Sequence, residues 1–300
     1  MKTCSLSILL GIMLILAIWA HRALGDATRP AALSPHPVRI VSLAPSITET
    51  LYALGLGDRV AGVTQFCEYP PDARNKPQVA GFADVNYEAV LRLRPDLVVL
   101  PRDKDRNKKE LEQLGLPVLP LDALSLSGLM DAVDRLGKAT GRENEAHAVL
   151  EAINNSLLAA RARATGRERP GVLFSVMHSY QGLGYITEIH AVGNDGFYNE
   201  LINAAGGRNV YTGDLAFPRL SREAVIFLNP EVIIDIIPES EDLEAVRRDW
   251  QSLASVAAIK NNRLHLLTGE ADTVPGPRSR QTLAKLSAAL HPQSSQGTGE

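Results

Sequence analysis

One segment of this 300-residue chain occurs twice, and the repeat constrains the fold more than any other feature. Residues 88–99 (EAVLRLRPDLVV) align without gaps to residues 223–234 (EAVIFLNPEVII). In both copies a helical pattern leads through a proline–acid pair into a short apolar run that is typical of a buried strand. A looser echo pairs 51–55 with 201–206. The chain is therefore predicted to contain two related α/β lobes.

Short apolar runs alternate with helical patterns in both halves of the chain, which is typical of mainly parallel sheets. The predicted strands are 38–43, 60–63, 97–100, 118–121, 172–176, 232–237 and 264–267. The predicted helices are 46–55, 86–93, 105–114, 195–205, 221–228, 250–258 and 278–290. Between the halves, residues 127–164 carry apolar side chains at three- and four-residue steps, so a long helix is expected there, with Gly141 as a point where it could break.

The predicted fold class is α/β: two Rossmann-like lobes joined by a long backbone helix, with a ligand cleft between them. The predicted segments are a leader (1–25), a flexible lead-in (26–37), an N-terminal α/β lobe (38–125), a linking helix (126–165), a C-terminal α/β lobe (166–291) and a disordered tail (292–300). Open α/β sheets bind ligands beyond the carboxyl ends of their strands, which is why the cleft is the expected site.

The N-terminus has the three parts of a secretory signal peptide. Lys2 precedes an apolar stretch over 6–20, and Ala23-Leu24-Gly25 offers small residues at a cleavage site. The alternative is an uncleaved anchor, for which about 15 residues is short. Cys4 precedes the apolar stretch, so it does not have the position of a lipoprotein cysteine. We expect a cleaved leader and a mature chain outside the cytoplasm.

Charge and motif content exclude several classes of protein. The formal net charge is −3, and it becomes −5 (29 basic against 34 acidic residues) without the leader, whereas a nucleic-acid-binding protein should show a basic excess. The mature chain keeps one cysteine, Cys67, which we expect to be buried. There is no P-loop and no GxSxG elbow, so no catalytic residue is predicted.

Aromatic residues are scarce, yet several fall in the loops that should border the cleft. These residues are Tyr69, Phe82, Tyr180, Tyr185 and Phe217. Flat rings in such loops suit a large planar or amphiphilic ligand.

From Arg39 to His291 the chain resembles the periplasmic substrate-binding proteins of ABC importers for cobalamin, haem and iron–siderophores. The segments that carry the resemblance are SLAPSITE (42–49), CEYP (67–70), LRPDLV (93–98), AGGRN (205–209) and FPRLSRE (217–223). Within that family, the chain most resembles the cobalamin binders, because of its Glu-Tyr-Pro loop and its aromatic-Pro-x-x-Ser-x-Glu block. The resemblance implies a monomeric, non-enzymatic periplasmic protein that captures a corrinoid, a metal-chelate small molecule, and delivers it to an ABC permease and its ATPase. It implies no cofactor, no metal site and no nucleic-acid partner.

The resemblance also implies roles for individual residues. Tyr69, Phe82 and Phe217 would line the corrinoid pocket, with Glu270 close to it. Cobalamin binders carry Trp at the positions of Phe82 and Phe217 and Asp at that of Glu270, which leaves room for another corrinoid or an iron chelate. Arg278 could bind ligand carboxylates or phosphate bidentately, with helix capping or surface pairing as equal alternatives.

In this family one exposed glutamate on each lobe docks onto arginines of the permease, and Glu88 and Glu223 match both positions. The internal repeat singles out the same two residues independently. The alternative is that each carboxylate only complements the dipole of its own helix.

His178, His190 and His265 show no metal-ligand spacing, and His178 is the one that falls in a cleft loop. Two other functions remain open beside corrinoid binding. One is a ferric-siderophore or haem carrier of the same family. The other is a secreted two-lobed enzyme with catalysis in the cleft, since a spatial triad is invisible in a sequence.

Overall fold

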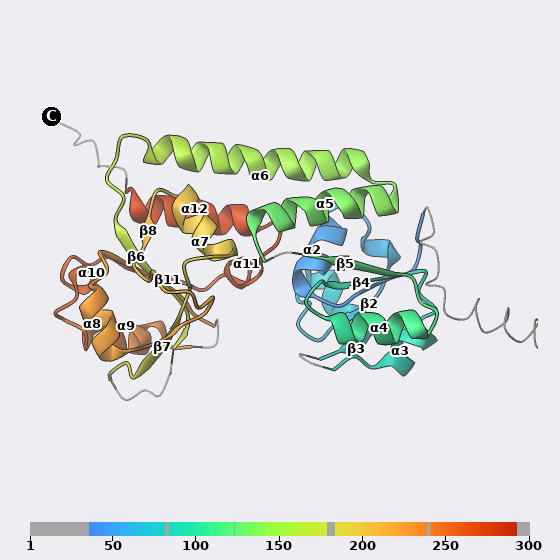
Figure 1. The fold of residues 1–300 in the computed structure, drawn as a ribbon, viewed down its shortest axis with the longest axis horizontal. Helices are drawn as coiled ribbons and strands as arrows, with labels where there is room; N and C mark the ends of the chain where they lie inside the picture. Colours follow the sequence, from blue (N-terminus) through green and yellow to red (C-terminus); the bar gives the residue numbers. More distant parts are fainter. Residues whose placement is uncertain (1–35, 82–83, 123, 179–183, 239–240, 293–300) are drawn as a thin grey trace, which may run out of the picture. The chain divides into compact units, whose positions relative to one another are not determined.

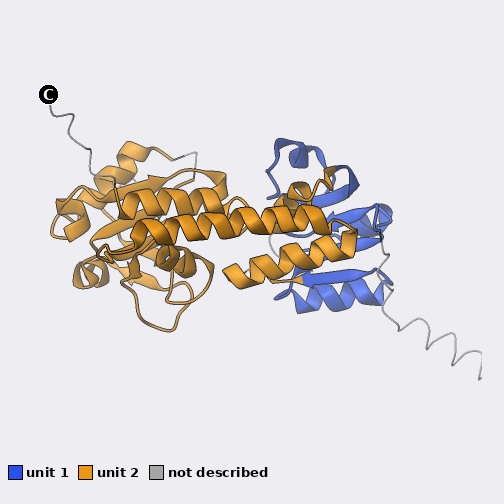
Figure 2. Cartoon of the chain, turned by 90° about the horizontal axis from the view of Figure 1, so that it is seen from above, with its two compact units in different colours: residues 1–44, 58–120 blue, residues 45–57, 121–300 orange. Residues whose placement is uncertain are grey.

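The structure is a computed structural model that describes residues 36–81, 84–122, 124–178, 184–238 and 241–292 (Figure 1). The chain divides into two compact units (Figure 2). Unit 1 comprises the residues up to 44 together with 58–120, and unit 2 comprises 45–57 together with the residues from 121 on. The leader, most of the lead-in, the tail, Phe82 and Tyr180 lie outside the described residues.

Unit 1 is built on a five-stranded sheet in the order β3-β2-β1-β4-β5. The strands are β1 (Ile40–Ser42), β2 (Val60–Thr64), β3 (Gln78–Ala80), β4 (Leu97–Pro101) and β5 (Val118–Leu121). β1 pairs in parallel with β2 and β4, and β2 pairs in parallel with β3. The helices are η1 (Gly57–Arg59), η2 (Pro71–Asn75), α3 (Tyr87–Arg92) and α4 (Asp105–Gln113). Valines and leucines of β1, β3, β4, α3 and α4 form the core.

Unit 2 contains a six-stranded sheet in the order β11-β10-β6-β7-β9, with β8 beside β6. The strands are β6 (Gly171–His178), β7 (Glu188–Ala191), β8 (Arg208–Asn209), β9 (Arg219–Ser221), β10 (Val232–Ile236) and β11 (Leu264–Leu267). β10 pairs in parallel with β6 and β11, whereas β7 is antiparallel to both β6 and β9. The predicted α/β fold class with mainly parallel sheets is confirmed, and the antiparallel β7 and β9 are an addition to it.

The helices of unit 2 differ from the prediction around Trp250 and in the linking segment 126–165. They are α2 (Pro45–Ala53), α5 (Leu126–Thr140), α6 (Glu143–Ala164), α7 (Phe197–Ala204), α8 (Arg222–Leu228), α9 (Leu243–Gln251), α10 (Ala257–Lys260), α11 (Glu270–Thr273) and α12 (Ser279–Leu290). The helix predicted over 250–258 was wrong, because α9 ends at Gln251 and α10 begins at Ala257. Trp250 is fully buried, and the backbone turns there as Leu253 N donates to Trp250 O.

The segment predicted as one linking helix over 126–165 is two helices. Gly141 caps α5 with a φ of 68°, and α6 then returns along α5. Helices α5 and α6 come very close at Gly137, where an added Cβ would clash with the Cβ of Ala146. The long helix that the fold class requires is α6 alone, with 22 residues, which also packs against α12 (Figure 1).

The internal repeat of the sequence is a structural repeat as well. Helices α3 and α8 begin with equivalent caps, since the Asn86 side chain accepts from Ala89 N and the Ser221 hydroxyl accepts from Ala224 N. After each helix, Arg94 and Asn229 occupy equivalent positions and both adopt left-handed φ values, 47° and 43°.

The acid after each proline also has one role in both units. Asp96 accepts hydrogen bonds from the backbone N–H groups of Val38 and Arg39, just before β1. Glu231 accepts one from Gly171 N, at the start of β6. In each unit the repeated acid therefore holds the first residues of the neighbouring parallel strand.

Within the described residues, no helix has both the length and the apolar character that crossing a bilayer requires.

Candidate functional site

Tyr69 lies in the loop that follows β2, beyond the carboxyl end of that strand. Its side chain is 39% exposed, so the ring is available to a ligand. Two residues earlier, Cys67 is buried as expected, and its Sγ lies 3.2 Å from the hydroxyl of Thr64. The buried thiol therefore fixes the base of the loop that presents Tyr69.

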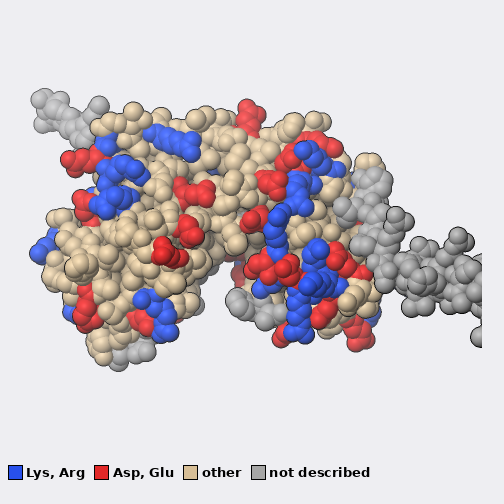
Figure 3. All heavy atoms as spheres, in the orientation of Figure 1, with Lys and Arg blue, Asp and Glu red and all other residues tan. Residues whose placement is uncertain are grey.

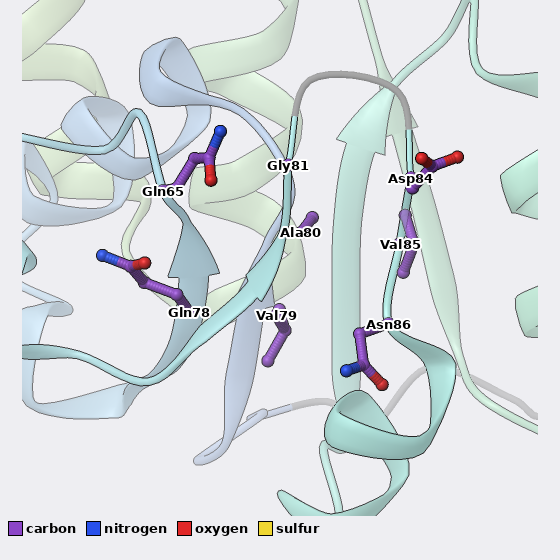
Figure 4. Close-up of a pocket in the computed structure, with 8 residues that line it drawn as sticks. All are labelled: Gln65, Gln78, Val79, Ala80, Gly81, Asp84, Val85 and Asn86. Atoms are coloured by element: carbon purple, nitrogen blue, oxygen red, sulfur yellow. The ribbon is translucent and has the colours of Figure 1, made fainter.

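A polar pocket of about 310 Å³ opens beside the same loop (Figure 4). Its lining includes the carboxamides of Gln65, Gln78 and Asn86 and the carboxylate of Asp84. Backbone hydrogen bonds shape it, because Asn86 N donates to Val79 O and Gly81 N donates to Asp84 O. The sequence pointed to the 80–86 loop through Phe82, but not to these carboxamides. Glutamine and asparagine are common on surfaces, so only their convergence in space marks them.

Phe217 lies in the loop between β8 and β9, and its side chain is 57% exposed. The loop is fastened to the segment after β7, because Ala191 N donates to Pro218 O and Gly193 N donates to Ala216 O. Gly193 is required for this approach, since an added Cβ would collide with the carbonyl oxygen of Leu215. Tyr185, 45% exposed, is a further available ring of unit 2.

Arg278 and Glu270 are brought together, with a third residue that the sequence did not indicate. Arg278 donates to both carboxylate oxygens of Glu49, from Nε at 2.9 Å and from an Nη at 2.5 Å. The same guanidinium lies 3.7 Å from Glu270. The side chain of Glu49 is 2% exposed, that of Arg278 15% and that of Glu270 29%. Glu270 is therefore the most accessible group of this cluster.

Burial raises the pKa of the Glu49 carboxyl, and the hydrogen bonds and positive charge of Arg278 oppose that rise.

The Glu49–Arg278 pair also explains why the units of the structure differ from the lobes predicted from the sequence. The sequence placed 45–57 in the N-terminal lobe, whereas these residues belong to unit 2, where α2 is tied to the start of α12. Arg278 thus has a protein partner in Glu49, and the same guanidinium also lies within ion-pair distance of Glu270.

Glu88 and Glu223 lie in the first turns of α3 and α8, and both are exposed. Glu88 pairs with Arg92 one turn later, at 3.0 Å. Hydrogen bonds from its own backbone N–H and from the Ser221 hydroxyl lower the pKa of Glu223. Both carboxylates are charged groups held in a defined orientation on equivalent helices.

The histidines that the structure describes form no metal site. His178 ends β6, but its side chain is not described. His190 lies 3.4 Å from Glu188, and burial lowers the pKa of His265. In the described part of the chain, no three His, Cys, Asp or Glu residues converge in a way that could hold a metal ion.

The fold has two α/β units with a repeated helix–strand motif. Exposed aromatic rings in its loops and one exposed carboxylate on each repeated helix are typical of a binding protein. Comparisons with known proteins support the same class. Residues 40–271 match the family described as periplasmic binding protein, so the chain belongs to that family. The resemblance inferred from the sequence is thereby confirmed.

Individual relatives include a substrate-binding lipoprotein of an ABC transporter and binding proteins for vitamin B12 and heme. An uncharacterized ABC transporter substrate-binding lipoprotein of Bacillus subtilis, YvrC, is 28% identical over 273 residues, which cover 89% of this chain and 84% of the relative. A vitamin B12-binding protein of Pectobacterium carotovorum is 27% identical over 229 residues, which cover 75% of this chain and 80% of the relative. The crystal structure of a periplasmic heme-binding protein from Pseudomonas aeruginosa is similar with a TM-score of 0.73 and 27% identity, covering 86% of this chain and 94% of that one.

Proposed function

We propose that this chain is the solute-binding protein of an ABC importer, and that it captures a corrinoid and delivers it to the permease and its ATPase. Membership of the periplasmic binding protein family carries the general part of the proposal. The relative that binds vitamin B12 and the relative named as an ABC transporter substrate-binding lipoprotein support the rest. The chain acts by binding alone and performs no reaction.

The polar pocket that Gln65 lines, in the same loop as Tyr69, is the observation that favours a corrinoid over haem. A corrinoid such as cobalamin carries primary amide groups on its rim, whereas haem carries two carboxylates. Gln65 and Gln78 can each donate to and accept from an amide, and Asn86, whose Oδ1 caps α3, keeps its amide N–H groups as donors. Asp84 can accept from an amide N–H, but it would repel a propionate. The lining thus suits a ligand edge rich in amides.

The exposed rings supply the apolar part of the binding energy. Tyr69 in unit 1 and Phe217 in unit 2 each present a flat face that loses contact with water when a macrocycle covers it. Phe82 has the same role in the proposal, although it lies outside the described residues. Glu270, oriented by Arg278, accepts a hydrogen bond from the ligand.

Titration of the purified protein with cyanocobalamin, haemin and a ferric hydroxamate siderophore tests the ligand. We expect cyanocobalamin to bind, and Tyr69→Ala and Phe217→Ala each to weaken its binding at least tenfold. Leu158→Ala is the matched control, since Leu158 is an exposed apolar side chain on α6, 61% accessible. Binding of haemin or the siderophore without cyanocobalamin would establish the alternative carrier, which the heme-binding relative keeps open. Turnover of a bound ligand would establish the enzyme.

The proposal places the mature chain in the periplasm as a monomer, released from a leader that is cleaved after Gly25. Mass spectrometry of the secreted protein should show the loss of residues 1–25, and a full-length, membrane-bound product would show an anchor instead. Sedimentation of the purified protein should give the mass of one mature chain.

Glu88 and Glu223 are the docking residues in this proposal. Each is an exposed carboxylate on a first helical turn, at the same place in its unit, and both would face arginines of the permease. The double reversal Glu88→Arg with Glu223→Arg should abolish uptake and leave ligand affinity unchanged. Uptake at the wild-type rate would mean that the two acids only complement their own helices.

A further inference from the structure

Helix α8 carries an exposed phenyl ring beside the proposed docking residue Glu223. Phe227 is 87% exposed, which makes it the most exposed large apolar side chain in the described part of the chain. It lies four residues after Glu223, and residues four apart share one face of a helix. Ile226, 39% exposed, extends the same apolar surface. A charged group and an unpartnered apolar group are therefore adjacent on α8.

The equivalent helix of unit 1 is different at this position. The internal repeat aligns α3 with α8, so that Glu88 corresponds to Glu223 and Arg92 to Phe227. Arg92 pairs with Glu88 at 3.0 Å and partly neutralises it. The two helices thus present the same carboxylate, one beside a cation and the other beside a phenyl ring.

The surrounding surfaces follow the same division. On the face shown in Figure 3, Lys, Arg, Asp and Glu side chains crowd the surface around α4 of unit 1. The surface of unit 2 around α8 and α10 carries fewer charged side chains on that face, although some of both signs are visible there. On this face, the surroundings of α8 are therefore less densely charged than those of α4.

We infer that the permease receives α8 in an apolar pocket that takes the Phe227 ring, next to the cation that pairs with Glu223. This inference rests on the proposed function, since it assumes that α3 and α8 dock on an importer. Both helices carry a partly exposed aliphatic side chain at equivalent positions, Leu91 and Ile226, so what unit 2 adds to the contact is burial of the Phe227 ring. The two docking helices are therefore not interchangeable in what they offer the permease.

Salt separates the two kinds of contact. Exposed charge pairs weaken as ionic strength rises, because the screening length falls from about 10 Å at 0.1 M to about 3 Å at 1 M. Burial of a phenyl ring does not weaken in this way. The part of the docking affinity that survives at high salt should therefore depend on Phe227.

The test measures binding of the purified, cyanocobalamin-loaded protein to its importer complex in lipid nanodiscs, at 0.1 M and 0.5 M NaCl. The variants are Phe227→Ser, Glu223→Arg and, as the matched control, Leu158→Ser on α6. We expect Phe227→Ser to weaken docking at least tenfold and by about the same factor at both salt concentrations, while ligand affinity and thermal unfolding stay at wild-type values. The loss caused by Glu223→Arg should instead shrink at 0.5 M, because salt screens charge. Leu158→Ser should dock as the wild type does.

Three other outcomes would overturn the inference in distinguishable ways. If Glu223→Arg loses docking and Phe227→Ser keeps it, the apolar pocket is refuted while the proposed function stands. If the wild-type protein does not dock at all, the proposed function itself fails. If the wild-type protein sediments as a dimer and Phe227→Ser as a monomer, a second copy of the chain covers the ring.

Discussion

Replacement of Arg278 by methionine should destabilise unit 2 severely. The change removes both hydrogen bonds to Glu49, whose side chain is only 2% exposed, and leaves a buried carboxylate without its cation. Breaking a buried ion pair on one side costs about 3–5 kcal/mol of unfolding free energy. For a unit of this size that corresponds to a fall of roughly 6–20 °C in melting temperature. Urea unfolding followed by Trp250 fluorescence and a thermal melt measure both quantities.

The stability lost in Arg278→Met should also depend on pH, in a direction that the pKa of Glu49 determines. In the variant, burial and the charge of Glu270 still raise the pKa of Glu49, while the opposing effect of Arg278 is lost. The folded variant then keeps a proton on Glu49 at pH values where the unfolded chain has released it. Its stability falls as pH rises through that window, so the deficit against the wild type should be largest at neutral pH and should shrink in mildly acidic buffer.

A surface pair of the same geometry serves as the control. Arg219 makes two hydrogen bonds to Glu188, at 2.8 and 2.6 Å, but its side chain is 68% exposed. Arg219→Met should therefore have little measurable effect on unfolding. The double variant Glu49→Leu with Arg278→Met should recover most of the lost stability, because no buried charge remains. If Arg278→Met unfolds like Arg219→Met at pH 7, the burial argument is refuted.

Three further predictions concern the scaffold and use urea unfolding at pH 7, followed by circular dichroism because one of the variants removes Trp250. Trp250→Phe removes the indole N–H that donates to the buried Asp235 at 2.7 Å, and should cost about 1–3 kcal/mol; an unchanged midpoint would contradict this. Arg94→Gly relieves a left-handed φ of 47° and should raise stability by about 0.5–1 kcal/mol, whereas a loss would show that the arginine makes compensating contacts. Gly206 has a φ of 85°, and Gly206→Ala would place a Cβ against Ala164 at the end of α6. The change should lower the free energy of unfolding by about 2 kcal/mol or more. Wild-type stability would mean that the end of α6 moves to make room.

Much of each α/β unit could be predicted because its signals are local. The helix starts at Asn86 and Ser221, and the strands that follow the two proline–acid pairs, depend on side-chain caps and apolar runs a few residues long. Even the equivalent roles of Asp96 and Glu231 were implicit in the aligned repeat. Local chemistry that occurs twice is strong evidence for the same local structure.

The antiparallel part of unit 2 could not be predicted in this way. β7 and β9 are only four and three residues long, and they mix charged and apolar side chains. Strands of that length are stabilised by pairing with a neighbour rather than by their own pattern. The break at Gly141 was visible as a glycine, but whether it ends a helix depends on α6 packing back on α5.

The residues of the candidate site also fall into two groups, those that local sequence motifs indicate and those that only the tertiary structure brings together. Tyr69, Phe217, Glu88 and Glu223 were predicted because they stand in recognisable local motifs, and the structure leaves all four exposed. The carboxamide pocket and the Glu49–Arg278 pair were missed. Gln65 and Asn86 are 21 positions apart in the chain, and Glu49 and Arg278 are 229 apart.

By itself, the sequence determined two repeated α/β units and the family, and it predicted a leader and a pair of matched acids, since each rests on residues close together in the chain. Only the tertiary structure decided that Arg278 is bound to Glu49, that α2 belongs with unit 2, and that Phe227 is left uncovered beside Glu223. Burial and ion pairing are properties of neighbours in space, and a linear pattern does not specify which distant side chain will fill that space.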